Sequence, residues 1–223
     1  MIKVHHLETS RSSRLLWLLE ELGLSYDVVT YQRDPKTIRA PESMKAVHPL
    51  GRSPLLEIDG RILAESGAIM EYLTEREGKL GAASVESRHA YQYWLHYAEG
   101  SAMTPILVKL LTSGIRNASV PFFMRPIMRT IANRVDKTYT DNELRTHFNW
   151  IETALSEREY FAGHRFSAAD VQMSYPIQGS FVRGDRLPER PHTVAWLQRM
   201  ESRPAYQRAL EKGGEPMLRR TPN

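Results

Sequence analysis

The first third of the chain alternates short apolar segments with one segment of helical period. Residues 1–7 and 26–31 carry β-branched and aromatic side chains, which predicts two strands. Between them, residues 14–22 place leucines at helical spacing and end at Gly23, a typical C-terminal cap. We therefore expect a strand, a helix and a second strand, followed by a short helical piece over 41–47.

A proline-led hairpin follows, and it carries the most informative pattern in the chain. Pro54 precedes the apolar run 55–58, and because proline cannot donate to a sheet ladder, it belongs at a strand start or an edge. An Asp-Gly pair then predicts a hairpin turn, and residues 61–64 return as the second strand. A polar pair begins the next helical pattern, which predicts a helix over 66–77.

The remainder of the chain has helical periodicity, beginning after a glycine- and alanine-rich linker at 78–84. Two long periodic segments, 87–113 and 121–157, contain prolines. We expect a kink at Pro105 and a break near Pro126. Shorter helical segments complete the chain. These patterns are typical of an all-helical domain.

The order of elements predicts two domains. An α/β domain with a small mixed sheet is expected over residues 1–80, and an all-α domain over residues 87–223. Within the second, Ser167 and Asp170 have the spacing of a capping box, with the acid three residues after the serine. Asp170 could be taken for a catalytic acid. The capping role is favoured, because an acid there satisfies free N–H groups at a helix start.

Composition and charge narrow the function classes. The chain has 223 residues and a net charge of +4, with 30 basic residues scattered among 26 acidic ones. No run approaches the roughly 18 apolar residues of a membrane span, and the N-terminus lacks a secretion signal, so we expect a cytoplasmic protein without membrane attachment. Nucleic-acid binding is not expected, because the nearest basic cluster fits a solvated helix face: Arg125, Arg129, Arg134 and Lys137.

The absence of cysteine excludes thiol–disulfide exchange and cysteine-protease chemistry by protein groups, so any sulfur chemistry comes from a ligand. A metal site is not expected either. His5 and His6 are neighbours on a strand and would point to opposite faces. His89 and His96 lack an acidic partner that would complete a known ligand pattern.

The Pro54 hairpin and the helix after it together indicate a site for a peptide-like, anionic ligand. The strand edge leaves backbone groups free to pair with a peptide, and a helix N-terminus binds a carboxylate. This segment, GRSPLLEIDGRILAESGAIMEYL, resembles the glutathione-binding half of cytosolic glutathione transferases. The segment FAGHRFSAADVQMSYPI resembles the structural signature of their helical domain, so the resemblance covers nearly the whole chain.

The resemblance implies roles for the residues around the hairpin. The bond before Pro54 is expected to be cis, and the backbone of Ser53 is expected to pair with the cysteinyl unit of glutathione. Glu65 and Ser66 are expected to hold the γ-glutamyl end. Arg52 is placed to clasp the glycyl carboxylate, because arginine offers paired donors.

The string SRSSR over residues 10–14 resembles the Ser-x-x-x-Arg pattern of serine-type members of bacterial or fungal kind. In these, the serine stabilises the thiolate and the arginine supports the start of the helix, so Ser10 and Arg14 take these roles here. The tyrosine type needs a tyrosine in the first strand, which residues 1–9 lack, and the cysteine type is excluded. The sequence leaves three other hydroxyls as candidates for the role of Ser10, those of Thr9, Ser12 and Ser13. It also leaves open a ligand contact by Arg11.

The resemblance therefore implies a thioredoxin-like domain followed by a helical glutathione-transferase domain, in a homodimeric detoxification enzyme. Glutathione would be the co-substrate, activated as thiolate for attack on an electrophilic or peroxide substrate. An isomerase or dehalogenase would share this first site. The alternative is a non-catalytic binding or regulatory protein on the same fold. The second substrate is expected between the domains, beside three residues of the first long helix: Tyr97, Met103 and Leu107.

Overall fold

The computed structural model describes residues 1–183 and 189–214, so the last part of the expected helical domain, 215–223, lies outside the described residues. The N-terminal part contains a sheet in the order β2-β1-β3-β4, with β1 and β2 parallel and the other pairs antiparallel. Val4 at the centre is fully buried and pairs with Val28 on one side and Leu56 on the other. The strands are β1 (Ile2–Leu7), β2 (Asp27–Tyr31), β3 (Leu55–Ile58) and β4 (Arg61–Ala64).

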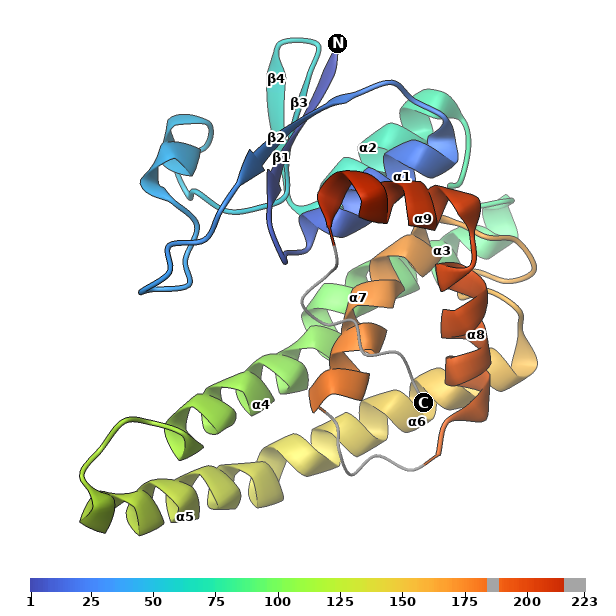
Figure 1. The fold of residues 1–223 in the computed structure, drawn as a ribbon. Helices are drawn as coiled ribbons and strands as arrows, with labels where there is room; N and C mark the ends of the chain where they lie inside the picture. Colours follow the sequence, from blue (N-terminus) through green and yellow to red (C-terminus); the bar gives the residue numbers. More distant parts are fainter. Residues whose placement is uncertain (184–188, 215–223) are drawn as a thin grey trace.

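Two helices, α1 (Ser12–Leu22) and α2 (Ser66–Glu77), cover one face of this sheet (Figure 1). A short 3₁₀ segment, η1 (Glu42–Ala46), lies in the connection between β2 and β3. Helix α1 ends at Gly23, whose φ of 71° is the left-handed conformation that glycine adopts without steric cost. The sequence predicted the bounds of β3, β4 and α2 correctly, and the predicted mixed α/β fold of the thioredoxin-like domain is confirmed.

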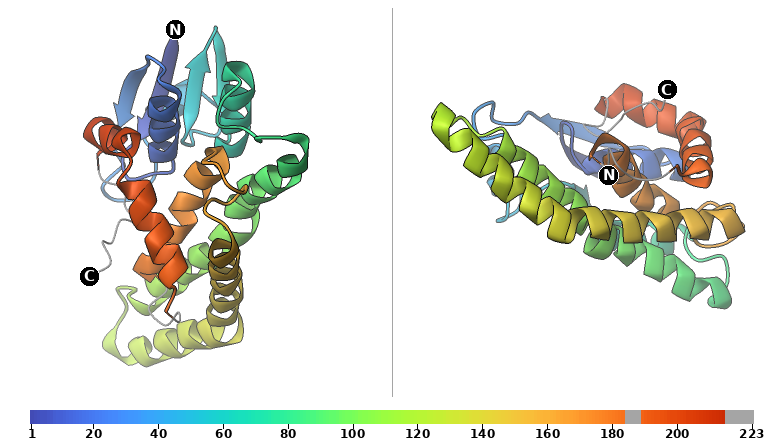
Figure 2. Two further views of the ribbon diagram at one scale, coloured as in Figure 1. Left: turned by 90° about the vertical axis from the view of Figure 1, so that its right-hand side faces the viewer. Right: turned by 90° about the horizontal axis from the view of Figure 1, so that it is seen from below.

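The rest of the described chain is helical, as predicted, and α4 and α5 run side by side away from the rest of the molecule (Figure 1, Figure 2). Helix α9 returns to pack against α1 of the N-terminal part. The segments are α3 (Val85–Tyr97), η2 (Ala98–Ala102), α4 (Met103–Arg116), η3 (Phe122–Met124), α5 (Arg125–Val135), η4 (Asp136–Thr140), α6 (Asp141–Glu157), α7 (Ala168–Arg183), α8 (Pro191–Glu201) and α9 (Pro204–Gly213).

The long helical segments are interrupted both at a place that the sequence predicted and at places that it did not. Segments η2 and η4 are π-helical turns, and neither contains a proline. Pro105 lies at the third position of α4, directly after η2, and Pro126 lies at the second position of α5, directly after the 3₁₀ segment η3. The break expected near Pro126 is confirmed, because the 3₁₀ segment η3 ends at Met124 and α5 begins at Arg125. The kink expected at Pro105 stays a prediction, and the sequence did not predict the π-helical turns, which have no comparable residue signature.

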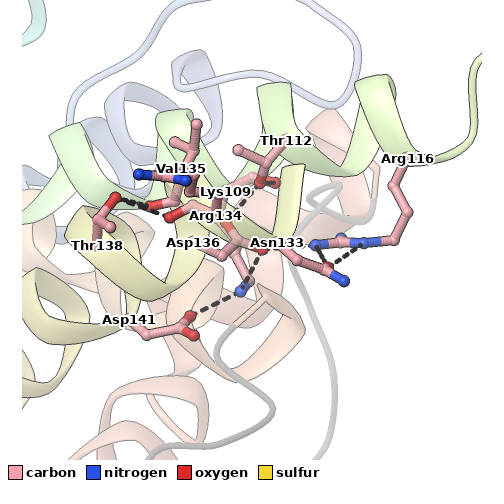
Figure 3. A network of polar contacts seen from close by, with 9 residues as sticks. All are labelled: Lys109, Thr112, Arg116, Asn133, Arg134, Val135, Asp136, Thr138 and Asp141. Atoms are coloured by element: carbon pink, nitrogen blue, oxygen red, sulfur yellow. Dashed lines mark hydrogen bonds and ion pairs between the residues drawn. The ribbon is translucent and has the colours of Figure 1, made fainter. Parts of the chain in front are cut away.

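A buried carboxylate in η4 fastens α4 to the helices that follow it (Figure 3). Asp136 accepts hydrogen bonds from Thr112 Oγ1 at 2.7 Å, Arg116 Nη2 at 2.6 Å and Lys109 Nζ at 3.0 Å. Lys109 also reaches Asp141 at 2.8 Å. Burial alone would raise the pKa of Asp136, but these partners outweigh it and hold the pKa below its ordinary value. The network stabilises the antiparallel pair of α4 and α5.

One hydrophobic core runs through both parts of the described chain. Trp17 of α1 is 1% exposed and packs edge-on against Tyr206 of α9, with ring centroids 5.1 Å apart. Phe166, before α7, lies against the same indole at 5.7 Å. Because α1 is wedged between the sheet and the helices, the residues at its N-terminus are held in a fixed position.

Candidate functional site

The loop before β3 and the loop before α1 meet at one point of the N-terminal part. The Ser53–Pro54 peptide bond is cis, as the resemblance implied, and Pro54 is buried. Ser53 Oγ lies 3.3 Å from Ser10 Oγ and accepts the backbone N–H of Leu7 at 3.4 Å. The structure thus brings the predicted catalytic serine beside the predicted peptide-binding turn, although 43 residues separate them.

Ser10 lies in the turn between β1 and α1 and is 5% exposed. Its Oγ accepts the backbone N–H of Ser12 at 3.3 Å and lies 2.9 Å from Ser12 Oγ. Ser12 Oγ in turn lies 2.7 Å from Nδ1 of His6. A hydroxyl that receives an N–H from a helix start retains its own proton for an anionic acceptor.

The rival hydroxyls have other partners in the described structure. Thr9 has a positive φ of 52° and donates to the carbonyl of Glu8 at 2.7 Å. Ser13 donates to the carbonyl of Ser10 at 3.1 Å, and Ser12 is fully buried beside His6. Among the four candidates, Ser10 is the one whose hydroxyl is described at hydrogen-bond distance from Ser53.

Ser66 begins α2 and is 6% exposed. Its Oγ accepts from Arg14 Nη2 at 3.2 Å and from Gln172 Nε2 at 3.1 Å. Arg14 therefore supports the start of α2, and not only that of its own helix. Gln172 comes from α7, so a residue of the helical part contributes directly to the predicted γ-glutamyl site.

Two further predicted binding residues, Glu65 and Arg52, lie at the surface beside this helix start and the cis bond. Glu65 is exposed and has a positive φ of 68°, which directs the chain into α2. Its backbone carbonyl accepts the N–H of Ile69 at 2.9 Å, while its side chain makes no described cap. Arg52 is exposed as well. Both side chains are accessible to a ligand.

A partly buried ion pair links this site to the helical part. Glu99, in the π-helical turn η2, contacts Arg14 Nη2 at 2.6 Å and Arg11 Nε at 3.1 Å. Burial lowers the pKa of Arg14 and Glu99 opposes this; burial would raise the pKa of Glu99, but Arg14 and Arg11 hold it below its ordinary value. Tyr175 of α7 lies over both guanidinium groups, at 5.6 Å from Arg11 and 5.1 Å from Arg14.

Sequence reasoning missed Glu99, Gln172 and Tyr175. Each reaches the site from a helix far along the chain, and no local motif marks it. Gln172 follows the capping-box serine closely, but that motif indicates a helix start and says nothing of a neighbour 106 residues away. The tertiary packing of α7 against α1, α2 and η2 determines these contacts.

The three residues expected beside a second substrate have different environments. Tyr97 and Met103 are 9% and 6% exposed and belong to the hydrophobic core. The Tyr97 hydroxyl lies 2.6 Å from Nδ1 of His147, and burial raises its pKa. Leu107 is 48% exposed on α4. The pocket assignment of these residues stays a prediction.

A hollow of about 700 Å³ lies elsewhere, at the end of α2 and the linker. Its walls carry charges of both signs, including Glu75, Arg88 and Arg165. None of the predicted site residues lines it. The contacts around Ser10 and Ser66, and not this hollow, therefore define the candidate site.

Asp170 has a structural environment, as the capping-box interpretation expected. Its carboxylate accepts backbone N–H groups of Phe161 and Ser167, each at 3.0 Å, and the indole N–H of Trp196 at 3.2 Å. The Ser167 hydroxyl donates to it as well, at 3.2 Å. Burial raises the pKa of Asp170 to about 6, although these four donors oppose the rise.

Within residues 1–183 and 189–214, no cluster of three potential metal ligands occurs. Over the same ranges, no helix has the length and apolar character that crossing a bilayer requires.

Comparison with known proteins gives one consistent family. Residues 1–75 match the glutathione S-transferase N-terminal domain, and residues 115–204 match the corresponding C-terminal domain. Glutathione S-transferase 1 of Saccharomyces cerevisiae is 36% identical over 95% of each chain, and glutathione S-transferase 3 of Schizosaccharomyces pombe is 35% identical over 95% of this chain and 88% of its own. A crystal structure of a glutathione S-transferase from Actinobacillus pleuropneumoniae superposes with a TM-score of 0.76 at 29% identity, covering 98% of this chain and 95% of that one.

Proposed function

This chain belongs to the glutathione S-transferase family, and we propose that it joins the sulfur of glutathione to a small electrophilic substrate. The relatives named as glutathione S-transferases span nearly its full length, which supports a transferase. The observation that carries the proposal is the meeting of Ser10 with Ser53 beside the cis Pro54 bond.

The proposed chemistry is activation of the glutathione thiol by the Ser10 hydroxyl. A free thiol has a pKa of about 8.5 and is mostly protonated at neutral pH, whereas the thiolate is the nucleophile. Lowering the pKa by one unit takes about 1.4 kcal/mol of differential stabilisation, which one hydroxyl hydrogen bond to the thiolate can supply. Ser10 is suited to this donation because it already accepts the N–H of Ser12 at 3.3 Å.

Glutathione would extend from Ser10 along the two loops. The backbone of Ser53 would pair with the cysteinyl unit, and Arg52 would clasp the glycyl carboxylate. Ser66 and the N–H groups at the start of α2 would bind the γ-glutamyl carboxylate, with Glu65 taking the ammonium group. The exposure of Arg52 and Glu65 supports their access to a ligand.

The electrophile would approach from the helical part. Leu107 is the accessible member of the predicted pocket residues, while Tyr97 and Met103 belong to the hydrophobic core. A peroxide is a second substrate class that the same thiolate would attack.

We also propose a cytosolic homodimer. The projecting face of α4, α5 and the segment between them exposes many large apolar side chains, and such a patch is typical of an interface. Its members include Leu110, Leu111, Phe122, Phe123, Ile127 and Ile131. Sedimentation of the purified protein at several concentrations tests this association.

A substrate panel tests the proposed reaction. Glutathione is combined with an activated aryl halide, an α,β-unsaturated carbonyl or an organic hydroperoxide, and turnover is followed for the wild-type protein and for Ser10→Ala. Ser202→Ala, on an exposed position after α8, is the matched control. Turnover that falls in Ser10→Ala alone supports the proposal. Retention on immobilised glutathione without turnover of any substrate would instead indicate a non-catalytic binding protein.

A further inference from the structure

Two β-branched residues of the described chain adopt the left-handed backbone conformation, Thr9 with a φ of 52° and Ile38 with a φ of 58°. This conformation is unfavourable for side chains that branch at the β-carbon. Thr9 directly precedes Ser10, so its φ sets the direction in which the chain enters the turn that carries the proposed catalytic hydroxyl. Contacts that hold Thr9 in this conformation therefore bear on the position of Ser10.

One arginine holds both of these residues. Arg33, two residues after the end of β2, donates through Nη2 to the backbone oxygen of Thr9 at 3.2 Å and through Nη1 to that of Ile38 at 3.0 Å. Its Nε donates to Thr9 Oγ1 at 3.3 Å. The planar guanidinium binds these acceptors in fixed directions at the same time. Arg33 thus ties the turn at Thr9 to the loop after β2.

The direction of each of these hydrogen bonds is unambiguous. A guanidinium can only donate, and a carbonyl oxygen can only accept. The Thr9 hydroxyl has one proton and donates it to the carbonyl of Glu8 at 2.7 Å, so its oxygen accepts from Arg33 Nε. None of these contacts involves Ser10 Oγ. Arg33 therefore acts on the position of that hydroxyl and does not compete for its proton.

The Arg33 side chain continues the connection to β2 beyond the end of the sheet. The pairing of β1 with β2 ends at Leu7 and Tyr31, and the N–H of Glu8 donates to the Tyr31 carbonyl at 3.0 Å. The next links from this side to the turn are the two hydrogen bonds from Arg33 to Thr9. The turn into α1 is thus fastened to β2 by a side chain where the backbone pairing stops.

We propose that Arg33 is a positioning residue, which holds Thr9 in the left-handed conformation and thereby keeps the Ser10 hydroxyl directed to the sulfur of glutathione. The inference rests on the proposed function, because it assumes that Ser10 donates to the thiolate. Arg33 acts through Thr9 and needs no contact with the substrate. Without the guanidinium, Thr9 would relax toward the conformations that β-branched residues favour, and the Ser10 hydroxyl would leave its place beside Ser53.

Three substitutions separate this role from a general effect of positive charge on the thiol. Arg33→Ala removes the charge together with all three hydrogen bonds. Arg33→Lys keeps the charge, but a single ammonium group cannot span the acceptors on Thr9 and Ile38. Arg39→Ala is the matched control, because Arg39 belongs to the same loop and is exposed, and the described residues offer its side chain no hydrogen bond or ion pair.

The test is the absorbance titration of the thiolate in the glutathione complex. Arg33→Ala should raise the pKa of the bound thiol by about 0.3 to 1 unit and lower kcat at pH 6.5 about two- to tenfold, with KM for glutathione within about twofold of wild type. Arg33→Lys should show at least half of this rise in pKa, and Arg39→Ala should show none. The rate of Arg33→Ala should recover at high pH, where the thiolate forms without help from Ser10.

Combination with Ser10→Ala shows whether Arg33 acts through the hydroxyl. In the Ser10→Ala protein, the additional change Arg33→Ala should leave the thiol pKa unchanged. A second rise of the same size would overturn the inference, because the effect of Arg33 would then bypass Ser10. A wild-type thiol pKa in Arg33→Lys would overturn it as well, because the charge alone would then be sufficient.

The outcomes separate this inference from the proposed function. If Ser10→Ala raises the thiol pKa while Arg33→Ala does not, the inference is overturned and the role of Ser10 stands. If Arg33→Ala does not fold, Arg33→Lys and its combination with Ser10→Ala decide. A bound thiol whose pKa is insensitive to Ser10→Ala overturns the catalytic assignment itself, whatever the Arg33 variants show.

Discussion

Glu99 Oε1 lies 2.6 Å from Arg14 Nη2, so a π-helical turn of the helical part is ion-paired to the helix that follows Ser10. The Arg14 side chain is 2% exposed and that of Glu99 is 32% exposed. Because Arg14 also donates to Ser66, this pair connects the domain interface with the predicted γ-glutamyl site. The domain interface and the predicted γ-glutamyl site therefore both depend on the ion pair between Arg14 and Glu99.

Replacing Glu99 by glutamine should destabilise the protein and weaken glutathione binding. The variant leaves the buried Arg14 without its anionic partner, which we expect to lower the free energy of unfolding by about 2–3 kcal/mol after allowance for the partial exposure of Glu99. KM for glutathione should rise, because Arg14 also holds Ser66. Urea unfolding and steady-state kinetics measure both effects.

Glu42→Gln is the control for this prediction. Glu42 pairs with Lys45 at 2.9 Å, but its side chain is 85% exposed, so its removal should change unfolding by less than about 0.5 kcal/mol. Equal effects of the two substitutions would contradict a special role for the Arg14–Glu99 pair.

Asp170→Asn should reduce stability and leave the chemistry of the folded protein intact. The amide of an asparagine would point its own N–H groups at some of the N–H groups whose hydrogen bonds Asp170 now accepts. Those buried donors would be left unpaired. We expect a loss of about 2–4 kcal/mol in unfolding free energy. Asp27→Asn, at an exposed position of β2, is the control. A fall in kcat without loss of stability would instead make Asp170 a catalytic acid.

The protein should lose stability on acidification below about pH 6.5, partly through His6. Burial holds the pKa of His6 below its ordinary value of 6.5, so below that pH the unfolded chain binds a proton that the folded chain does not. Stability therefore falls as pH falls. Asp170 contributes to the pH dependence of stability in the opposite direction. Burial raises its pKa to about 6, so the folded chain binds its proton before the unfolded chain does as the pH falls.

The comparison of wild type with His6→Asn isolates the histidine contribution. Melting temperatures between pH 7.5 and 5.5 should fall less steeply for His6→Asn than for wild type, although the variant is less stable at neutral pH. Parallel curves for the two proteins would show that His6 keeps an ordinary pKa in the fold.

Gly213→Ala should destabilise the contact between α9 and the N-terminal part. A β-carbon at this position would collide with the Leu16 side chain and lie 3.3 Å from Cε1 of His6. Leu16 is fully buried, so the strain should cost about 1–3 kcal/mol. Gly114→Ala in α4 meets no atom within 4 Å and should gain about 0.5–1 kcal/mol by its higher helix propensity. Thermal unfolding should give a melting temperature below that of the wild type for Gly213→Ala and above it for Gly114→Ala.

Local motifs account for the parts of this protein that the sequence predicted. The hairpin after Pro54 and the helix begun by Ser66 depend on turn residues, caps and periodicity within a few positions. The placement of Ser10 beside Ser53 followed from the resemblance, which encodes a contact that local patterns do not contain. The roles of these residues toward glutathione stay predictions.

Contacts over long sequence separations account for what the sequence did not predict. Glu99 reaches Arg14 across 85 residues, and Gly213 reaches His6 across 207. The π-helical turn that carries Glu99 contains Gly100 but no proline, and a single glycine does not distinguish it from a regular helix. Pro126 correctly marked the start of α5, because proline fits the first turn of a helix, whereas the π-helical turn η4 contains no such marker.

The thiol pKa of glutathione bound to Ser10→Ala tests the central claim most directly. The account predicts nearly unchanged glutathione binding, a thiol pKa about one unit above that of the wild-type complex, and a five- to thirty-fold lower rate at neutral pH, from the loss of about 1–2 kcal/mol. The rate should partly recover at high pH, where the thiolate forms without help. A wild-type pKa and rate in Ser10→Ala would contradict the account and leave Ser10 a structural residue of the turn before α1.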